Sequence, residues 1–152
     1  MVNKKEKSDL QISDERIRGF VEKSAVAIYC FELEQPIDMS LPINDQLDLL
    51  YRHAFIAEAN DFYAKIAGFG RSADMKGLHL SKIMPRELPE NVTQLKRLIR
   101  AIYNLTLVES IEVYPTGTER IVLNDVVGII KDGCFFRAWR TGVDITEIRA
   151  TE

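Results

Sequence analysis

The chain has 152 residues, of which 46% are hydrophobic, so it can bury one core and is too short for two full domains. Its 20 basic and 23 acidic residues give a net charge of −3, which argues against a nucleic-acid-binding surface. No stretch approaches the roughly 20 apolar residues of a membrane-spanning helix, and the lysine-rich start lacks the apolar segment of a signal peptide. We therefore expect a single cytoplasmic domain without membrane insertion.

The N-terminal part of the chain predicts a tail, a helix and a strand. Residues 1–12 are charged and polar, so we expect a flexible tail. Residues 13–22 predict a short amphipathic helix, because three apolar residues share one of its faces: Ile17, Phe20 and Val21. Residues 25–33 are rich in β-branched and aromatic side chains, which predicts a well-buried strand.

The next part of the chain predicts a loop, a second strand and a short helix. Residues 34–50 contain two prolines and several acidic residues, which indicates an inserted loop with a helical turn near residues 45–50. A second strand is expected over residues 51–58. Asn60 then caps a helix over residues 61–67, because its side chain can accept a hydrogen bond from a first-turn N–H.

The C-terminal half predicts one longer helix and three strands. The helix begins at Glu90 and has one apolar face: Val92, Leu95, Leu98, Ile99 and Ile102. The strands are expected over residues 105–114, 120–130 and 134–143, and the last two are joined by a hairpin turn at Asp132–Gly133. This order of elements predicts an α+β fold, a five-stranded antiparallel sheet with short helices on one face.

The chain resembles the PAS sensory family from about Phe20 to Glu147, and three segments carry the resemblance. Glu58-Ala59-Asn60-Asp61-Phe62 follows the second strand, with Gly68-Phe69 at the end of the helix after it. Gly77 lies at the entry to the middle helices, and the third segment is Trp139-Arg140-Thr141-Gly142-Val143-Asp144-Ile145-Thr146-Glu147. The resemblance implies a single domain over residues 13–147 and the start of a C-terminal signalling helix or linker over residues 148–152.

The resemblance implies a sensor domain of a larger signalling protein, such as a two-component histidine kinase, a diguanylate cyclase or a transcriptional regulator. A pocket between the sheet and the helices would bind a small molecule, and Asp144 and Thr146 would relay its state to an output domain in the same chain. The alternative is a ligand-free module for dimerisation or protein interaction. A homodimer is expected in either case, through apolar side chains that would otherwise be exposed: Ile17, Phe20, Val21 and Trp139.

The last strand supplies the candidate ligand-binding residues, because side chains alternate between the faces of a sheet. Phe136, Ala138, Arg140 and Gly142 share one face, and by resemblance this face lines the pocket while Trp139 faces outward. Asn124 and Tyr29 complete the candidate set. An arginine beside an apolar cavity is costly unless paired, so Arg140 either meets an anionic ligand together with Asn124, or pairs with a carboxylate of the chain or reaches solvent. We favour the second interpretation.

Cofactor and catalytic patterns are weak in this sequence. Haem-binding relatives place a histidine on the long helix, but residues 90–103 contain none, which leaves only His79 open as a haem ligand. The reactive cysteine of the family's flavin-binding light sensors is missing from Gly68-Phe69-Gly70-Arg71. Cys30 and Cys134 lie in apolar runs without Cys-x-x-Cys spacing, so we expect free thiols. No catalytic pair and no metal site are predicted, and the ligand stays unidentified.

Overall fold

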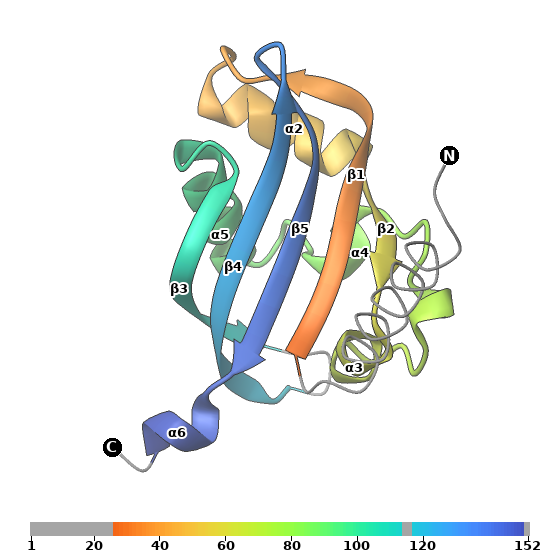
Figure 1. The fold of residues 1–152 in the computed structure, drawn as a ribbon, viewed down its shortest axis with the longest axis vertical. Coiled ribbons are helices and arrows are strands. Elements are labelled where there is room, and N and C mark those ends of the chain that lie inside the picture. Colours follow the sequence, from red (N-terminus) through yellow and green to blue (C-terminus); the bar gives the residue numbers. More distant parts are fainter. Residues whose placement is uncertain (1–25, 114–116, 151–152) are drawn as a thin grey trace, which may run out of the picture.

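The computed structural model describes residues 26–113 and 117–150. A five-stranded antiparallel sheet has the order β2-β1-β5-β4-β3 (Figure 1). Its strands are β1 (Val26–Asp38), β2 (Ala54–Ala59), β3 (Asn104–Val113), β4 (Glu119–Lys131) and β5 (Cys134–Asp144). The helices are α2 (Ile43–His53), α3 (Asp61–Ile66), the single turn η1 (Ser72–Asp74), α4 (Leu80–Ile83), α5 (Pro89–Arg100) and α6 (Thr146–Ala150).

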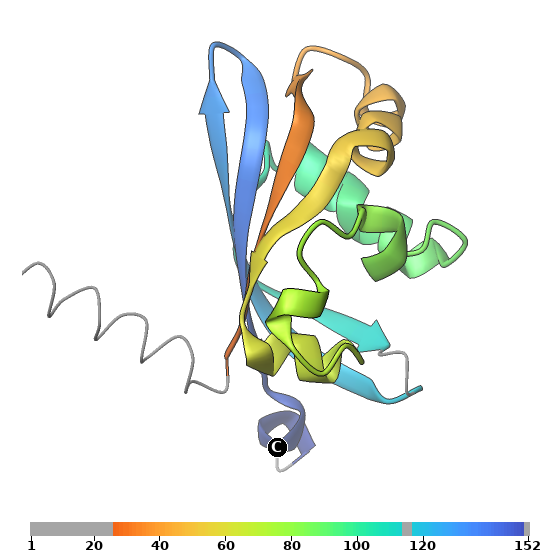
Figure 2. The ribbon, with the colours of Figure 1, turned by 90° about the vertical axis from the view of Figure 1, so that its right-hand side faces the viewer.

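The helices α2, α3, α4 and α5 all lie on one side of the sheet, as Figure 2 shows. The short helix α6 extends past the end of β5 (Figure 1). The predicted α+β architecture, a five-stranded antiparallel sheet with helices on one face, is confirmed for the described residues. The predicted tail of residues 1–12 and the predicted helix with Ile17, Phe20 and Val21 lie outside these residues. None of the described helices is long and apolar enough to cross a membrane.

The loop predicted over residues 34–50 is wrong for most of this segment, which contains the end of β1 and most of α2, whereas the helical turn predicted near residues 45–50 does lie within α2. The acidic residues that suggested a loop are exposed, two of them on β1 and two on α2, while Leu47 and Leu50 of α2 are buried. The strand tolerates Pro36 because the pairing of β1 with β5 is interrupted between Glu32 and Ile37, so no ladder hydrogen bond is lost. The second strand begins at Ala54 rather than at residue 51, since α2 runs to His53.

Asn60 caps α3, as predicted, and it also fastens the helix to the sheet. Its Oδ1 accepts hydrogen bonds from the backbone N–H of Tyr63 at 3.0 Å and of Ile28 at 3.1 Å. Its Nδ2 donates to the carbonyl of Val26 at 2.7 Å. The side chain is buried, so these bonds satisfy it where water cannot.

The three C-terminal strands agree with the prediction to within one residue at each described end. Asp132 and Gly133 form the hairpin turn with φ of 53° and 74°, both in the left-handed region that this tight turn requires. Ile102 does not belong to the buried face of α5, because the helix ends at Arg100 and the chain turns there. Ile102 has a φ of 56° and is 57% exposed, and the next residue, Tyr103, enters the core instead.

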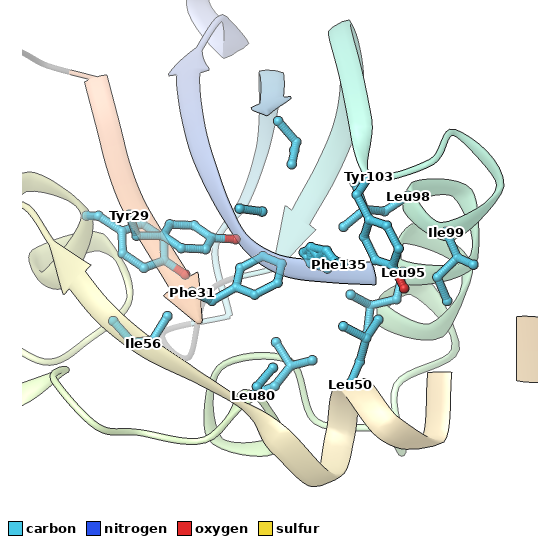
Figure 3. Packing of buried hydrophobic residues seen from close by; sticks show 14 of the residues in the cluster. Tyr29, Phe31, Leu50, Ile56, Leu80, Leu95, Leu98, Ile99, Tyr103 and Phe135 are labelled. Carbon is cyan, nitrogen blue, oxygen red and sulfur yellow. The ribbon is translucent and has the colours of Figure 1, made fainter. Parts of the chain in front are cut away.

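Tyr103 connects the end of α5 to both α2 and the sheet. Its ring stacks on that of Phe135 with centroids 3.7 Å apart, and Figure 3 shows both rings among the buried side chains. Its hydroxyl donates to Oε1 of the buried Gln46 at 2.8 Å. Gly128 allows the close approach, because a Cβ there would lie 2.6 Å from the carbonyl oxygen of Tyr103. This contact fixes how the helices cover the sheet.

Candidate functional site

A cavity of about 270 Å³ lies between the helices and the β3 side of the sheet. Its wall is mainly apolar and includes Tyr63, Phe69, Ile83 and Met84. The remaining lining side chains are Ala67, Lys82, Leu88, Glu90, Asn91, Gln94, Ile111, Glu112, Val113 and Arg140. The combination of an apolar wall with a few polar groups is typical of small-molecule sites.

A second, smaller cavity of about 60 Å³ lies between α5 and the sheet. The two cavities share Met84, Gln94 and Arg140 in their walls. Of these two cavities, Tyr29 and Phe31 line only the smaller one, next to Leu95 and Leu98 of α5. The three shared side chains therefore border both spaces.

Arg140 makes the densest polar contacts in this region. Its guanidinium donates from Nε to Oδ1 of Asn124 at 2.9 Å and from Nη1 to the hydroxyl of Tyr29 at 2.9 Å. Nη2 pairs with Glu112, and the side chains of Arg140 and Glu112 are only 13% and 15% exposed. In this structure Arg140 therefore pairs with a carboxylate of its own chain, on the edge strand β3, which is separated from β5 by β4.

Asn124, on β4, connects Arg140 on β5 to the edge strand β3 through hydrogen bonds. Its Nδ2 donates to Oγ of Ser110 at 2.7 Å and to the carbonyl of Val108 at 3.2 Å, both on β3. Its Oδ1 accepts from Arg140 on β5, and the side chain is buried. The amide therefore orients the guanidinium, because its carbonyl end faces Arg140 and its NH₂ end faces β3.

The structure places most of the predicted ligand-binding residues on the inner face of the sheet. Arg140, Tyr29 and Gly142 line cavities, and Asn124 contacts Arg140 directly. Ala138 is fully buried in the core but is not among the residues that line the cavities described here. Five of the six candidates therefore lie on the predicted side.

The prediction that Phe136 faces the pocket is wrong. Ile129 pairs with Arg137 while the next residue, Ile130, pairs with Phe135, so Phe136 is an extra residue in β5. One extra residue reverses which side chains face inward beyond it. Phe135 is therefore fully buried, whereas Phe136 is 38% exposed on the outer face. Trp139 lies on that outer face as predicted, 37% exposed.

The joint between β5 and α6 contains both predicted relay residues. Oδ1 of Asp144 accepts from the backbone N–H of Thr146 at 2.9 Å and from its hydroxyl at 2.7 Å, while Oδ2 accepts from Nε of Arg120 at 2.6 Å. Oγ1 of Thr146 in turn accepts from the N–H of Ile121 at 2.8 Å. Burial alone raises the pKa of Asp144, but the hydrogen bonds from Thr146 and Arg120 outweigh it and hold the pKa below its usual value.

The two histidines lie together at the β2 side of the sheet, away from the cavities. Nε2 of His79 is 3.0 Å from Oε1 of Glu34, and Nδ1 of His53 is 3.9 Å from the same oxygen. Cys30 and Cys134 are free, and burial raises the pKa of the Cys30 thiol to about 11. Within residues 26–113 and 117–150, no group of three or more His, Cys, Asp and Glu side chains is arranged to hold a metal ion.

Sequence reasoning missed the carboxylate partner of Arg140 and the residues that separate the two cavities. Glu112 alternates with exposed residues on an edge strand, a pattern that by itself indicates only a solvated strand. Gln94 and Met84 come from helical segments whose distance from the sheet no local pattern reports. A register for the β3–β4 pair would have identified Glu112, because it places that residue on the inner face.

Comparisons with known proteins agree with this architecture. No protein-family model matches the sequence, and neither does any curated protein. Solved structures do match. The PAS domain of an HTR-like protein from Haloarcula marismortui aligns with a TM-score of 0.50 at 12% identity, over 94% of this chain and 100% of that one.

Two further structures show the same arrangement. A PAS domain from Colwellia psychrerythraea aligns with a TM-score of 0.57 at 15% identity, covering 90% of this chain and 98% of the other. VqmA bound to DPO aligns with a TM-score of 0.55 at 15% identity, covering 86% of this chain and 56% of that one. At these identities the similarity reports the fold and leaves the ligand and the activity open. The chain has the PAS fold.

Proposed function

We propose that this protein is a PAS sensor domain that binds a small molecule in the cavity beside Arg140 and relays its presence through the Asp144–Thr146 joint. The observation that carries the proposal is the cavity of about 270 Å³ with a charged, hydrogen-bonded wall. The cavity opens to solvent, since Leu88, Ile111 and Val113 in its wall are 46%, 60% and 54% exposed, so a small molecule could enter it. An apolar wall beside the largely buried ion pair of Arg140 and Glu112 is the combination expected of a small-molecule site.

The lining residues favour a ligand with an apolar body and one polar, anionic group. Tyr63, Phe69 and Met84 would contact the body, and Arg140 would meet the anionic group, with Gln94 as a further polar contact. The similarity to VqmA bound to DPO supports the general idea, since that protein of the same fold is seen with a bound molecule. The domain would regulate rather than catalyse, and any chemistry would belong to another domain.

The output would follow the joint at the end of β5. Thr146 starts α6, and the carboxylate of Asp144 holds its first turn. We propose that the domain belongs to a cytoplasmic signalling protein, such as a histidine kinase of a two-component system, a diguanylate cyclase or a transcriptional regulator. In each of them, α6 would lead towards the output domain.

Native mass spectrometry against the denatured mass tests the binding proposal directly. We expect the native protein to carry a reproducible added mass, which Arg140→Ala and Asn124→Ala reduce. Trp139→Phe serves as the control, since it lies on the opposite face and should leave the added mass unchanged. A protein without added mass after gentle purification, and without a stability gain from a metabolite library, would contradict the proposal.

A homodimer through the outer face of the sheet is the second proposal, and it does not exclude the first. Five apolar side chains are well exposed on this face: Val127, Ile129, Phe136, Trp139 and Val143. Contiguous apolar patches of this kind mark interaction surfaces. The predicted helix over residues 13–22 would add to the same interface.

Sedimentation velocity tests the dimer. Val127→Glu places a charge at a position that is 55% exposed on the outer face, and we expect it to give monomers. Ile102→Glu is the matched control, because Ile102 is 57% exposed but lies at the end of α5. Deletion of residues 1–23 should also weaken the dimer. An unchanged dimer in both Val127→Glu and the deletion variant would reject this interface.

A further inference from the structure

Four charged side chains alternate in sign across the inner face of the sheet near α6. Arg140 on β5 pairs with Glu112 on β3, and Arg120 on β4 pairs with Asp144 on β5. The register places Glu112 directly opposite Arg120. Residues directly opposite one another in an antiparallel pair have Cβ atoms roughly 5 Å apart, so the carboxylate of Glu112 can reach either arginine.

A small cavity of about 10 Å³ adjoins both ion pairs, because Glu112, Arg140 and Asp144 border it together with Gly142. Gly142 contributes no side chain to this border. Because Glu112 and Arg120 face each other in the register, a change of side-chain torsion angles is enough to turn the carboxylate from one arginine towards the other.

We propose that Glu112 is an exchangeable partner that occupies Arg140 until an anionic ligand displaces it, and then turns to Arg120. The reason is the cost of leaving a buried carboxylate without a cation, since the Glu112 side chain is only 15% exposed. Arg120 is the cation opposite it in the register. Once there, Glu112 competes with Asp144 for the same guanidinium.

The competition between Glu112 and Asp144 for Arg120 affects α6 through the carboxylate of Asp144. Asp144 uses Oδ2 for Arg120 and Oδ1 for the N–H and hydroxyl of Thr146. When Arg120 shares its charge with Glu112, Asp144 is held less firmly and the cap on the first turn of α6 weakens. Arg140 thereby reports ligand charge to α6 through two carboxylates and one arginine.

The exchange rests on the ligand-sensing function proposed above, but it can be tested without a ligand. Arg140→Gln removes the resting partner of Glu112, so the carboxylate turns to Arg120. We expect the hydrogen-exchange rate of the Thr146 amide, measured by NMR, to rise about two- to fivefold. A change of this size corresponds to the stabilisation that a partly exposed ion pair typically contributes. Glu112→Gln removes the competitor, so the Thr146 rate stays at the wild-type value.

The double variant Arg140→Gln/Glu112→Gln decides between exchange and general damage. We expect it to exchange at the wild-type rate, because no carboxylate is left to compete with Asp144. A double variant as fast as Arg140→Gln alone, or an Arg140→Gln variant at the wild-type rate, overturns the proposal. Amide spectra of all three variants check that the sheet remains folded, and the Asn124 amide reports a local loss of structure if one occurs.

A pair of probes tests the ligand class. Benzoate and benzamide have nearly the same shape and differ in charge, so only benzoate should accelerate Thr146 exchange in the wild-type protein. Neither probe should do so in Glu112→Gln. Binding of both probes in the cavity with equal effects on Thr146 would overturn the exchange and leave the sensor function standing. The native mass measurement above tests that function separately.

Discussion

The two adjacent phenylalanines of β5 provide the sharpest test of the structure. Phe135 is fully buried, with its ring stacked on Tyr103 at 3.7 Å and 6.0 Å from the ring of Phe31. Phe136 is 38% exposed on the opposite face. Truncation of a buried phenylalanine costs about 3–5 kcal/mol, since both transfer energy and a cavity are involved. We expect Phe135→Ala to lose this amount and Phe136→Ala to lose less than about 1 kcal/mol.

Urea unfolding followed by far-UV circular dichroism measures both losses. Because domains of this size are stable by only about 5–15 kcal/mol, Phe135→Ala can unfold the protein outright. Phe135→Leu, compared with Phe136→Leu, is the milder pair, and we expect a loss of about 1–2 kcal/mol for the first alone. Equal losses of stability at the two positions, or a larger loss at Phe136, would show that Phe136 is not an extra residue in β5. The strand would then alternate regularly, with Phe136 facing inward.

Three further predictions follow from other contacts. Gly128→Ala should lower the free energy of unfolding by about 1–3 kcal/mol, because its Cβ would overlap the backbone of Tyr103. A loss near zero in urea unfolding would contradict the close contact between Gly128 and Tyr103. Asn60→Ala should cost about 2–4 kcal/mol, since it removes a helix cap and a bond to the carbonyl of Val26. The folded-state pKa of Asp144 lies below its unfolded value, so its contribution is complete above the unfolded pKa of about 3.9 and is lost as the pH falls through the folded value. Asp144→Asn should therefore flatten the fall of the urea midpoint on the acid side, and an unchanged pH profile would show that the carboxylate does not act in this way.

Local patterns predicted the elements whose signals lie within a few residues of sequence. The Asp132–Gly133 turn follows from its backbone requirement, and the cap at Asn60 follows from one side chain and the N–H three residues later. The shared face of Arg140 and Gly142 follows from alternation, because the strand is regular from Arg137 to Asp144, and the resemblance to the PAS family assigned that face to the inside. These predictions needed no knowledge of distant residues.

The predictions failed where distant residues decide the outcome. The extra residue at Phe136 depends on how β4 pairs with β5, and no property of the Phe-Phe pair itself reveals it. The acidic residues of α2 are as compatible with a loop as with the solvent face of a helix, and only the burial of Leu47 and Leu50 distinguishes the two. Glu112 contacts Arg140 across 28 positions of sequence, through two strand pairings.

The position of Gly142 bears on how the proposed binding site and the proposed output could share one strand. Arg140 and Asp144 lie four residues apart on the same face of β5, a separation of about 13 Å at the usual rise per residue. Gly142, between them, contributes no side chain, Arg120 approaches this stretch from the neighbouring strand β4, and Glu112 approaches it from β3 beyond. A change of charge at Arg140 therefore needs no movement of the backbone to reach Thr146, because side chains that already lie in contact or in register can carry it. In the proposed exchange the sheet would keep its shape while the charge at its end changes, and α6 would be the element that responds.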